Sequence, residues 1–284
     1  MQSPELGHPG RLLLSAPWLK KYTQAFQLGI QVALEYRINF MISLISAAYP
    51  IFIQTFMWTA IYQNANEQAV YGYTYRQMIA YTFMAGLIAR IVRTGFEYDI
   101  MDDIKNGKYS KFLVQPIGYF PYRLANFLGQ KLPNLAMILG ILVIVLIGLN
   151  TLWGVSLQFV QVLAFLVTLL LAVILNFLIF YCFSAVAFWI FEIGFLFEGI
   201  RITTILLSGG IFPLEVFGPK FVTFSNLLPF KYTINYPINV LNGKIPADQI
   251  IPGLLIQCVW IGLSWALARV LWHEGGKHYV AVGG

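Results

Sequence analysis

Long apolar segments alternate with short polar ones along almost the whole chain, and this alternation predicts helices that cross a membrane. A spanning helix needs roughly 17 to 25 predominantly apolar residues. Six segments supply that length, at residues 39–62, 75–96, 122–149, 157–183, 194–210 and 250–272. The sequence therefore predicts one all-α membrane domain, residues 1–284, with six transmembrane helices.

The segment before the first predicted span, residues 18–37, mixes apolar and charged positions at helical spacing. Phe26, Ile30 and Leu34 can share one face, while Lys20 and Lys21 lie largely elsewhere. Such a pattern is typical of an amphipathic helix that lies in the membrane interface. The alternative is a plain extension of the first span into the cytoplasm.

Two further segments are too polar or too broken to span. Residues 97–116 are dense in charge and predict a cytoplasmic loop, with a short helix that ends at Asn106-Gly107. Residues 211–248 contain several prolines but are too apolar for a solvated loop. Irregular backbone survives at membrane depth only where protein covers it, so we expect short re-entrant helices on the external side.

The distribution of lysine and arginine predicts the orientation, because cytoplasmic loops carry the excess of these residues. With the N-terminus inside, the external side holds only Arg76, Lys220, Lys231 and Lys244. The cytoplasmic side then holds Arg11, Lys20, Lys21, Arg37, Arg90, Arg93, Lys105, Lys108, Lys111, Arg123, Arg269 and Lys277. We therefore expect a multi-pass plasma-membrane protein, of the bacterial inner membrane type, with both termini cytoplasmic.

Composition supports the membrane assignment. Of the 284 residues, 58% are hydrophobic and only 11% charged, whereas soluble domains are about a quarter charged. The net charge of +6 comes from residues at the ends of apolar segments, where they set topology and meet anionic lipid rather than nucleic acid. Cys182 and Cys258 lie in apolar segments and favour packing roles over a disulfide.

The sequence contains no recognisable nucleotide-binding or catalytic motif. There is no phosphate-binding G-x-x-x-x-G-K-[ST] loop and no H-E-x-x-H, and the three histidines lie near the ends of the chain. We expect no catalytic residues, no metal site and no cofactor bound by this chain. The sequence thus predicts a pathway or scaffold without an energy source of its own.

A few charged residues lie inside apolar segments, where charge is costly. Lys131 lies within the third predicted span, and Glu198 and Arg201 share a helical face in the fifth. For the latter two the alternatives are an ion pair and a polar site facing a transport route. Arg90 and Arg93, at the inner end of the second span, either set topology or contact a substrate anion or a nearby acid.

Three local motifs have a familiar order. Ile104-x-x-Gly107 is followed by Lys111-x-Leu113-x-x-Pro116, then comes Gly210-Ile-Phe-Pro213-Leu, and the chain ends with Trp272 and Gly276-Lys-His-Tyr279. In this order and with six predicted spans, the chain resembles the permease subunits of ABC-2 type transporters.

The resemblance implies an exporter in which this permease pairs with a second one, identical or similar, and with two copies of an ATPase that binds ATP and Mg. It places a coupling helix at about residues 97–106. Its predicted contacts with the ATPase are Glu97, Asp99, Asp102, Asp103 and Lys105, with solvated loop residues as the alternative. Lys131, Glu198 and Arg201 become candidate pathway residues, and Phe212 and Pro213 an external gate.

Other functions fit the residues less well. An ion-coupled secondary transporter normally needs intramembrane acids and repeat symmetry, and only Glu192 and Glu198 lie at membrane depth. A membrane enzyme would need a clustered polar site near one interface. A non-catalytic membrane scaffold differs from a permease by not stimulating an ATPase.

Overall fold

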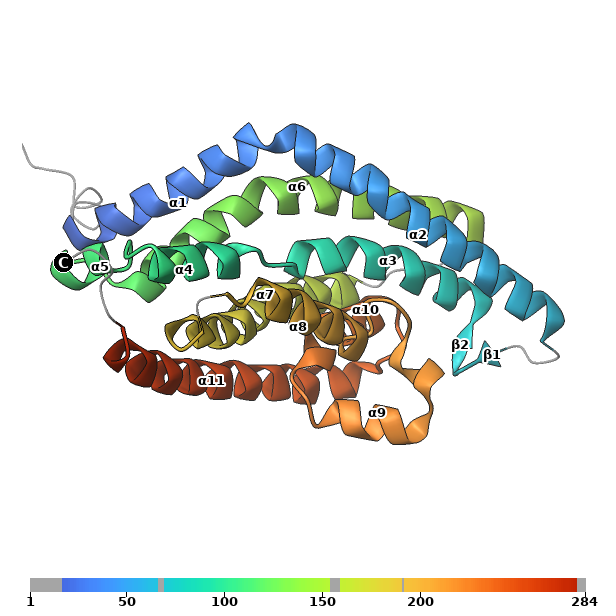
Figure 1. The fold of residues 1–284 in the computed structure, drawn as a ribbon. Helices are drawn as coiled ribbons and strands as arrows, with labels where there is room; N and C mark the ends of the chain where they lie inside the picture. Colours follow the sequence, from blue (N-terminus) through green and yellow to red (C-terminus); the bar gives the residue numbers. More distant parts are fainter. Residues whose placement is uncertain (1–16, 66–68, 154–158, 191, 280–284) are drawn as a thin grey trace, which may run out of the picture.

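The computed structural model describes residues 17–65, 69–153, 159–190 and 192–279, and helices dominate these residues (Figure 1). Among them, five helical stretches are long and apolar enough to cross a membrane: Arg37–Asn64, Tyr75–Lys105, Tyr119–Ile144, Phe159–Phe188 and Ala247–Lys277. An all-α membrane protein fits this architecture, and the one sheet of the described chain is a hairpin of two-residue strands.

The elements follow one another with short connections. The long helices are α1 (Pro17–Glu35), α2 (Arg37–Asn64), α3 (Tyr75–Val92), α6 (Tyr119–Trp153), α7 (Phe159–Ser184) and α11 (Ala247–Lys277). The shorter elements are β1 (Ala69–Val70), β2 (Tyr73–Thr74), α4 (Phe96–Lys105), α5 (Ser110–Val114), η2 (Ala185–Phe188), α8 (Gly194–Leu207), η3 (Leu214–Phe217), α9 (Pro219–Asn226), η4 (Phe230–Thr233) and α10 (Asn235–Leu241).

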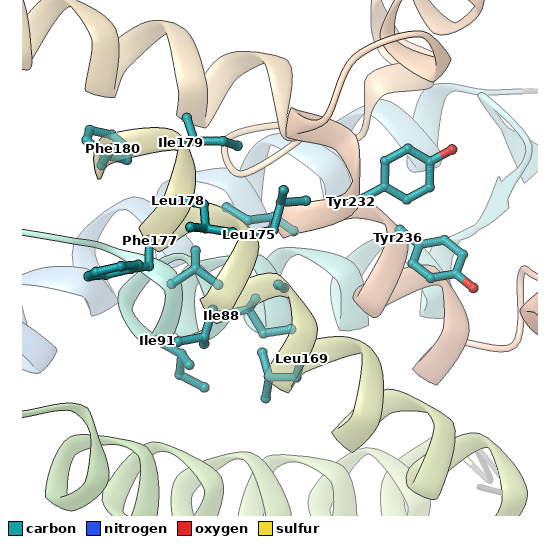
Figure 2. Close-up of a cluster of buried hydrophobic side chains, with 14 of the residues drawn as sticks. Ile88, Ile91, Leu169, Leu175, Phe177, Leu178, Ile179, Phe180, Tyr232 and Tyr236 are labelled. Atoms are coloured by element: carbon teal, nitrogen blue, oxygen red, sulfur yellow. The ribbon is translucent and has the colours of Figure 1, made fainter. Parts of the chain in front are cut away.

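Helix α7 lies at the centre of the core. From Ala172 onward nearly every side chain of α7 is buried, as expected for a segment that is hydrophobic on all sides. Figure 2 shows Ile88 and Ile91 of α3 beside α7 and places Tyr232 and Tyr236 at another side of it. Gln257 of α11 adds polar ties, because its amide donates to the carbonyl oxygens of Thr168 and Tyr232 at 2.9 and 3.0 Å.

The chain bends at Tyr36, so α1 and α2 are separate helices rather than one straight extension (Figure 1). Helix α1 packs closely along α6, and two glycines make this contact possible. A Cβ at Gly129 would collide with the carbonyl oxygen of Phe26, and one at Gly29 with that of Asn126. Small residues are the usual means by which helix backbones approach each other in membranes.

The predicted fifth span, residues 194–210, differs most from the structure. Helix α8 has 14 residues, which is about 21 Å at 1.5 Å per residue and shorter than a ~30 Å hydrocarbon core. It ends because Gly209 adopts a φ of +76°, a conformation that favours glycine. Of the six predicted spans, five therefore correspond to helical stretches of the described chain that are long and apolar enough to cross a membrane, and α8 is too short.

Helix α8 connects the region of α4 with a turn that contacts α3. It starts beside Tyr98 of α4 and ends where Tyr81 of α3 donates to the carbonyl oxygen of Gly209 at 2.7 Å. Lys21 of α1 donates to the carbonyl oxygen of Pro116 at 2.9 Å, and Tyr279 lies 2.8 Å from Ser110 of α5. Both ends of the described chain thus lie at one end of the molecule, termed here the α4–α5 end.

Between α8 and α11 the chain makes a return loop near the β-hairpin end. It runs outward through η3 and α9 and comes back at Asn235, whose backbone N–H donates to the carbonyl oxygen of Ser208 at 2.9 Å. Tyr73 then donates to Glu215 and Asn239 at 3.1 and 3.0 Å. This network fastens the broken 211–248 segment to β2 and so holds its irregular backbone in place.

The close α1–α6 contact predicts that G129A destabilises the protein by about 1–3 kcal/mol, because overpacking forces the two backbones apart. The matched control is G140A on the same helix, where a Cβ would meet nothing within 4 Å. Thermal melting of both purified variants in detergent measures the difference. Equal melting temperatures would show that the α1–α6 contact is loose.

Candidate functional site

The charge-dense segment forms two short helices, α4 and α5, which follow α3 along the chain. Helix α4 begins after Gly95, and Glu97 and Asp99 in its first turn complement the helix dipole. It ends at Asn106, followed by Gly107 with a φ of +72°. The apolar side chains Phe96, Ile100 and Ile104 face inward, so one face of α4 is fixed to the core.

A buried ion pair ties α4 to α8. Glu97 is 0% exposed and accepts a hydrogen bond of 2.7 Å from Arg201. Arg201 also pairs with Glu198 at 2.9 Å, and Tyr98 donates to the same Glu198 oxygen at 2.6 Å. The predicted ion pair of Glu198 and Arg201 therefore exists, and it is extended to α4 by Glu97.

A second buried ion pair ties α4 to α6. Arg123 pairs with Asp103 and lies 3.4 Å from Asp99, and its Nε donates to the hydroxyl of Tyr119 at 3.1 Å. Tyr119 in turn donates to Asp103 at 2.9 Å. Asp103, Arg123 and Tyr119 are all buried, so this network stands inside the protein rather than on its surface.

The residues predicted to contact an ATPase thus separate into two groups. Glu97 and Asp103 are buried and held within the chain, which leaves neither carboxylate free for an outside partner. Asp102 and Lys105 are exposed and make ion pairs with Lys108 and Glu192, and half of the Asp99 side chain is exposed. The hydrogen bond to Asp102 raises the pKa of Lys108 above its ordinary value.

Helix α5 presents two exposed apolar side chains: Leu113, which belongs to the first of the three sequence motifs, and Val114, which no sequence pattern singled out. Leu113 is 62% and Val114 84% exposed, whereas Phe112 of the same helix contacts the rings of Tyr119 and Tyr122. Behind α5, Trp272 stacks on Tyr181 with ring centres 4.4 Å apart, and Tyr109 lies 5.1 Å from Tyr279. The aromatic residues of the C-terminal motif therefore support α5 from beneath.

The side chain of Lys131, on α6, reaches the C-terminal end of α3. Its ammonium donates to the carbonyl oxygen of Arg93 and, at 3.5 Å, to that of Arg90. Asn176 donates to the carbonyl oxygen of Val92 at 2.6 Å. These two side chains satisfy carbonyl groups that are left without a partner where α3 breaks, which gives Lys131 a structural role.

A mostly apolar cavity of about 250 Å³ lies between α3, α7 and α8. Arg201 lines it together with Asn176 and Phe180, so the buried ion pair of α8 borders this space. Of the predicted pathway residues, Glu198 and Arg201 pair with each other, but Arg201 lines this cavity and neither Glu198 nor Lys131 does.

The predicted gate residues lie toward the β-hairpin end. The ring of Phe212 packs edge-on against Trp58 of α2 with centres 6.1 Å apart, and Pro213 is buried. Nearby, Lys244 pairs with Glu215 at 2.7 Å and lies over the Tyr73 ring at 3.3 Å. Burial lowers the pKa of Lys244, and the hydrogen bond to Glu215 offsets only part of this lowering.

The described residues hold no group of three histidine, cysteine or acidic side chains placed to bind a metal. Cys182 is buried and Cys258 exposed, and both are free thiols. The polar chemistry of the described chain is therefore one of ion pairs and hydrogen bonds at the α4–α5 end and near the β-hairpin.

A family model of ABC-2 family transporter proteins matches residues 48–283. The chain belongs to the ABC-2 transporter family. The match covers α2 from its second half onward and everything after it, including both ion pairs of α4. Searches of curated proteins and of solved structures found no match.

Membership in the ABC-2 family makes the chain a membrane component of an ABC transporter, with the role of a permease subunit. ABC-2 permeases are generally non-catalytic and associate with an ABC ATPase. A multi-pass membrane protein is the form that this family and the long apolar helices support.

The buried pair of α4 and α8 predicts that E97Q lowers the free energy of unfolding by on the order of 2 kcal/mol, because Arg201 stays charged and keeps only its exposed partner Glu198. The control is E192Q, which breaks an exposed ion pair with Lys105 and should cost at most about 1 kcal/mol.

Thermal melting in detergent measures both variants. The double variant E97M/R201M removes both buried charges and should recover part of the lost stability. If E97Q and E192Q have the same melting temperature, the Glu97–Arg201 pair does not hold α4 in place.

Proposed function

We propose that this chain is the permease subunit of an ABC exporter, in which it forms the substrate pathway and receives force at its α4–α5 end from a separate ATPase. The observation that carries the proposal is the geometry of α4. It is a surface helix with an exposed polar face, and two buried ion pairs anchor its other face to α6 and α8.

The exposed part of the α4–α5 end is the proposed docking surface. Leu113 and Val114 supply an apolar centre, and Asp102 and Lys105 supply charges around it. An apolar centre with a polar rim is the usual anatomy of a protein interface. Glu97 and Asp103 are not part of this surface because they are buried. Only the exposed residues are therefore proposed to contact the ATPase.

Movement of α4 would then reach the transport route through its ion pairs. Arg201 borders the cavity between α3, α7 and α8, so a displacement of α4 relative to the core changes the wall of that cavity. An ATPase that binds nucleotide shifts such an equilibrium only if it binds the two states of the permease with different free energies. ATP and Mg belong to that partner in this proposal.

The return loop near the β-hairpin is proposed to close the route on the external side, with Phe212 and Pro213 near its opening. In this orientation the α4–α5 end is cytoplasmic, and so are both termini, since both ends of the described chain lie there. The basic residues of α4 and α5 then face the cytoplasm, as in a bacterial inner membrane.

A second permease, identical or similar, is proposed to pair with this one in the membrane. Large apolar side chains are exposed along α2, α8 and α11, among them Phe56, Phe195 and Val259. Such surfaces are covered by lipid or by another subunit. Two permeases would supply two docking surfaces for the two copies of the ATPase.

The docking proposal predicts that L113D/V114D weakens recovery of the ATPase with the permease by about tenfold or more, because charge replaces the apolar centre of the interface. The measurement is co-expression with candidate ABC ATPases, affinity purification through the permease, and ATPase activity of the complex. D102K should act in the same direction by reversing a charge at the rim.

The matched control is D248K, an equal charge reversal at an exposed position at the start of α11. It should leave both recovery and ATPase activity unchanged. If L113D/V114D recovers as much ATPase as the wild-type chain does, Leu113 and Val114 are not the centre of the docking surface. If no ATPase is recovered with the wild-type chain, the result favours a membrane scaffold or a secondary transporter over the permease.

A further inference from the structure

A second cavity, of about 240 Å³, lies between the start of α2, the end of α3 and the middle of α6. Three cationic side chains line it, namely Arg90, Arg93 and Lys131, and no carboxylate of the described chain does. Gln130 and Asn134 add polar groups to the wall. The cavity therefore has a concentrated positive charge with hydrogen-bonding groups beside it.

These cations differ from the other arginines at the same end of the molecule. Arg123 and Arg201 each meet two carboxylates, whereas Arg90 and Arg93 make no ion pair with any described residue. Glu97, which follows them in the chain, is already held by Arg201. A cluster of cations that no carboxylate of the described chain offsets attracts anions, so this cavity suits an anion from outside the chain.

Lys131 brings its charge to the same place. Its ammonium binds the main-chain carbonyl oxygens of Arg90 and Arg93. These carbonyl groups orient the amino group of Lys131 beside the two arginines. The three basic side chains therefore lie together at the break between α3 and α4, where Lys131 binds the main chain of both arginines.

An apolar groove adjoins the cationic cavity. It measures about 210 Å³ and is lined by leucines of α6 and α7, with Lys131 on the boundary shared by the two spaces. A ligand that fits both must carry an anionic group and an apolar chain. Guanidinium groups bind phosphate oxygens in a bidentate manner, which makes phosphate the anion that this cavity suits best.

We propose that Arg90, Arg93 and Lys131 bind the phosphate of an anionic phospholipid, with one acyl chain in the adjoining leucine-lined groove. The site lies beside the first turns of α2, where Phe40 and Ser43 form part of its wall, and the proposal places it at the level where headgroups meet the bilayer. Lipid binding at this site requires neither an ATPase nor transport. The lipid proposal can therefore be tested separately from the proposed permease function.

The test uses the full chain purified in detergent, titrated with phosphatidylglycerol, phosphatidylcholine or inorganic phosphate. Bound lipid is measured by native mass spectrometry and stabilisation by thermal melting. We expect phosphatidylglycerol to bind more tightly than phosphatidylcholine. R90Q/R93Q should raise the dissociation constant of phosphatidylglycerol about thirty-fold, since each basic residue contributes about 1 kcal/mol to binding an anionic lipid.

Two variants separate charge from folding. R90K/R93K keeps the charges and should retain most of the preference for phosphatidylglycerol, and R93Q alone should raise the dissociation constant about five-fold. R269Q is the matched control, because Arg269 is an exposed arginine of α11 that contacts Trp265 and lies outside the cavity. It should leave lipid binding unchanged.

Equal affinity for phosphatidylglycerol in the wild-type chain and in R93Q would overturn the site. Equal binding of phosphatidylglycerol and phosphatidylcholine would overturn it as well. If inorganic phosphate stabilises the chain through Arg90 and Arg93 and phosphatidylglycerol does not, the cavity binds a free anion and the lipid proposal is wrong.

Discussion

The two buried ion pairs of α4 are the constraint on which the arrangement of the α4–α5 end depends. Removing one partner of a buried pair leaves an uncompensated charge and costs several kcal/mol. Arg201 and Arg123 therefore hold α4 to α8 and α6 at once. A force on α4 either moves these three helices together or must supply the energy to separate a pair.

The core explains why such a force can be transmitted. Helix α7 is buried on all sides in its second half, and Asn176 on it caps the end of α3. The break between α3 and α4 is thus fixed from two sides, by Asn176 and by Lys131. In contrast, α8 contacts little besides α4 and the return loop, and two of its exposed residues, Phe195 and Ile202, are apolar. A shift of α4 is therefore more easily absorbed by α8 than by α3 or α7.

Hydropathy predicted most of the fold because the long helices are long apolar segments, but it failed at α8. Residues 194–210 are mostly apolar, with Glu198 and Arg201 as the charged exceptions, and the backbone conformation of Gly209 ends the helix early. The site was harder to predict, since composition does not distinguish a buried acid from an exposed one. Yet a signal was present in α4: Phe96, Ile100 and Ile104 repeat at helical spacing, and Glu97 and Asp103 flank that apolar face. Their arginine partners, 104 and 20 residues away in the chain, follow from tertiary contacts and from no local pattern.

The lysine and arginine residues also differ in ways that the sequence does not reveal. A count of lysine and arginine predicts orientation because every cation at one end contributes equally to that sum. The structure divides these cations by their surroundings. Arg123 and Arg201 are neutralised by acids of the chain, Lys131 binds main-chain carbonyl oxygens, and Arg90 and Arg93 keep an unbalanced charge beside a cavity. Setting topology does not require a cavity, since a cation can reach the interface on its own long side chain. The shape of the protein around these two arginines is therefore better explained by an anion that enters it than by orientation alone.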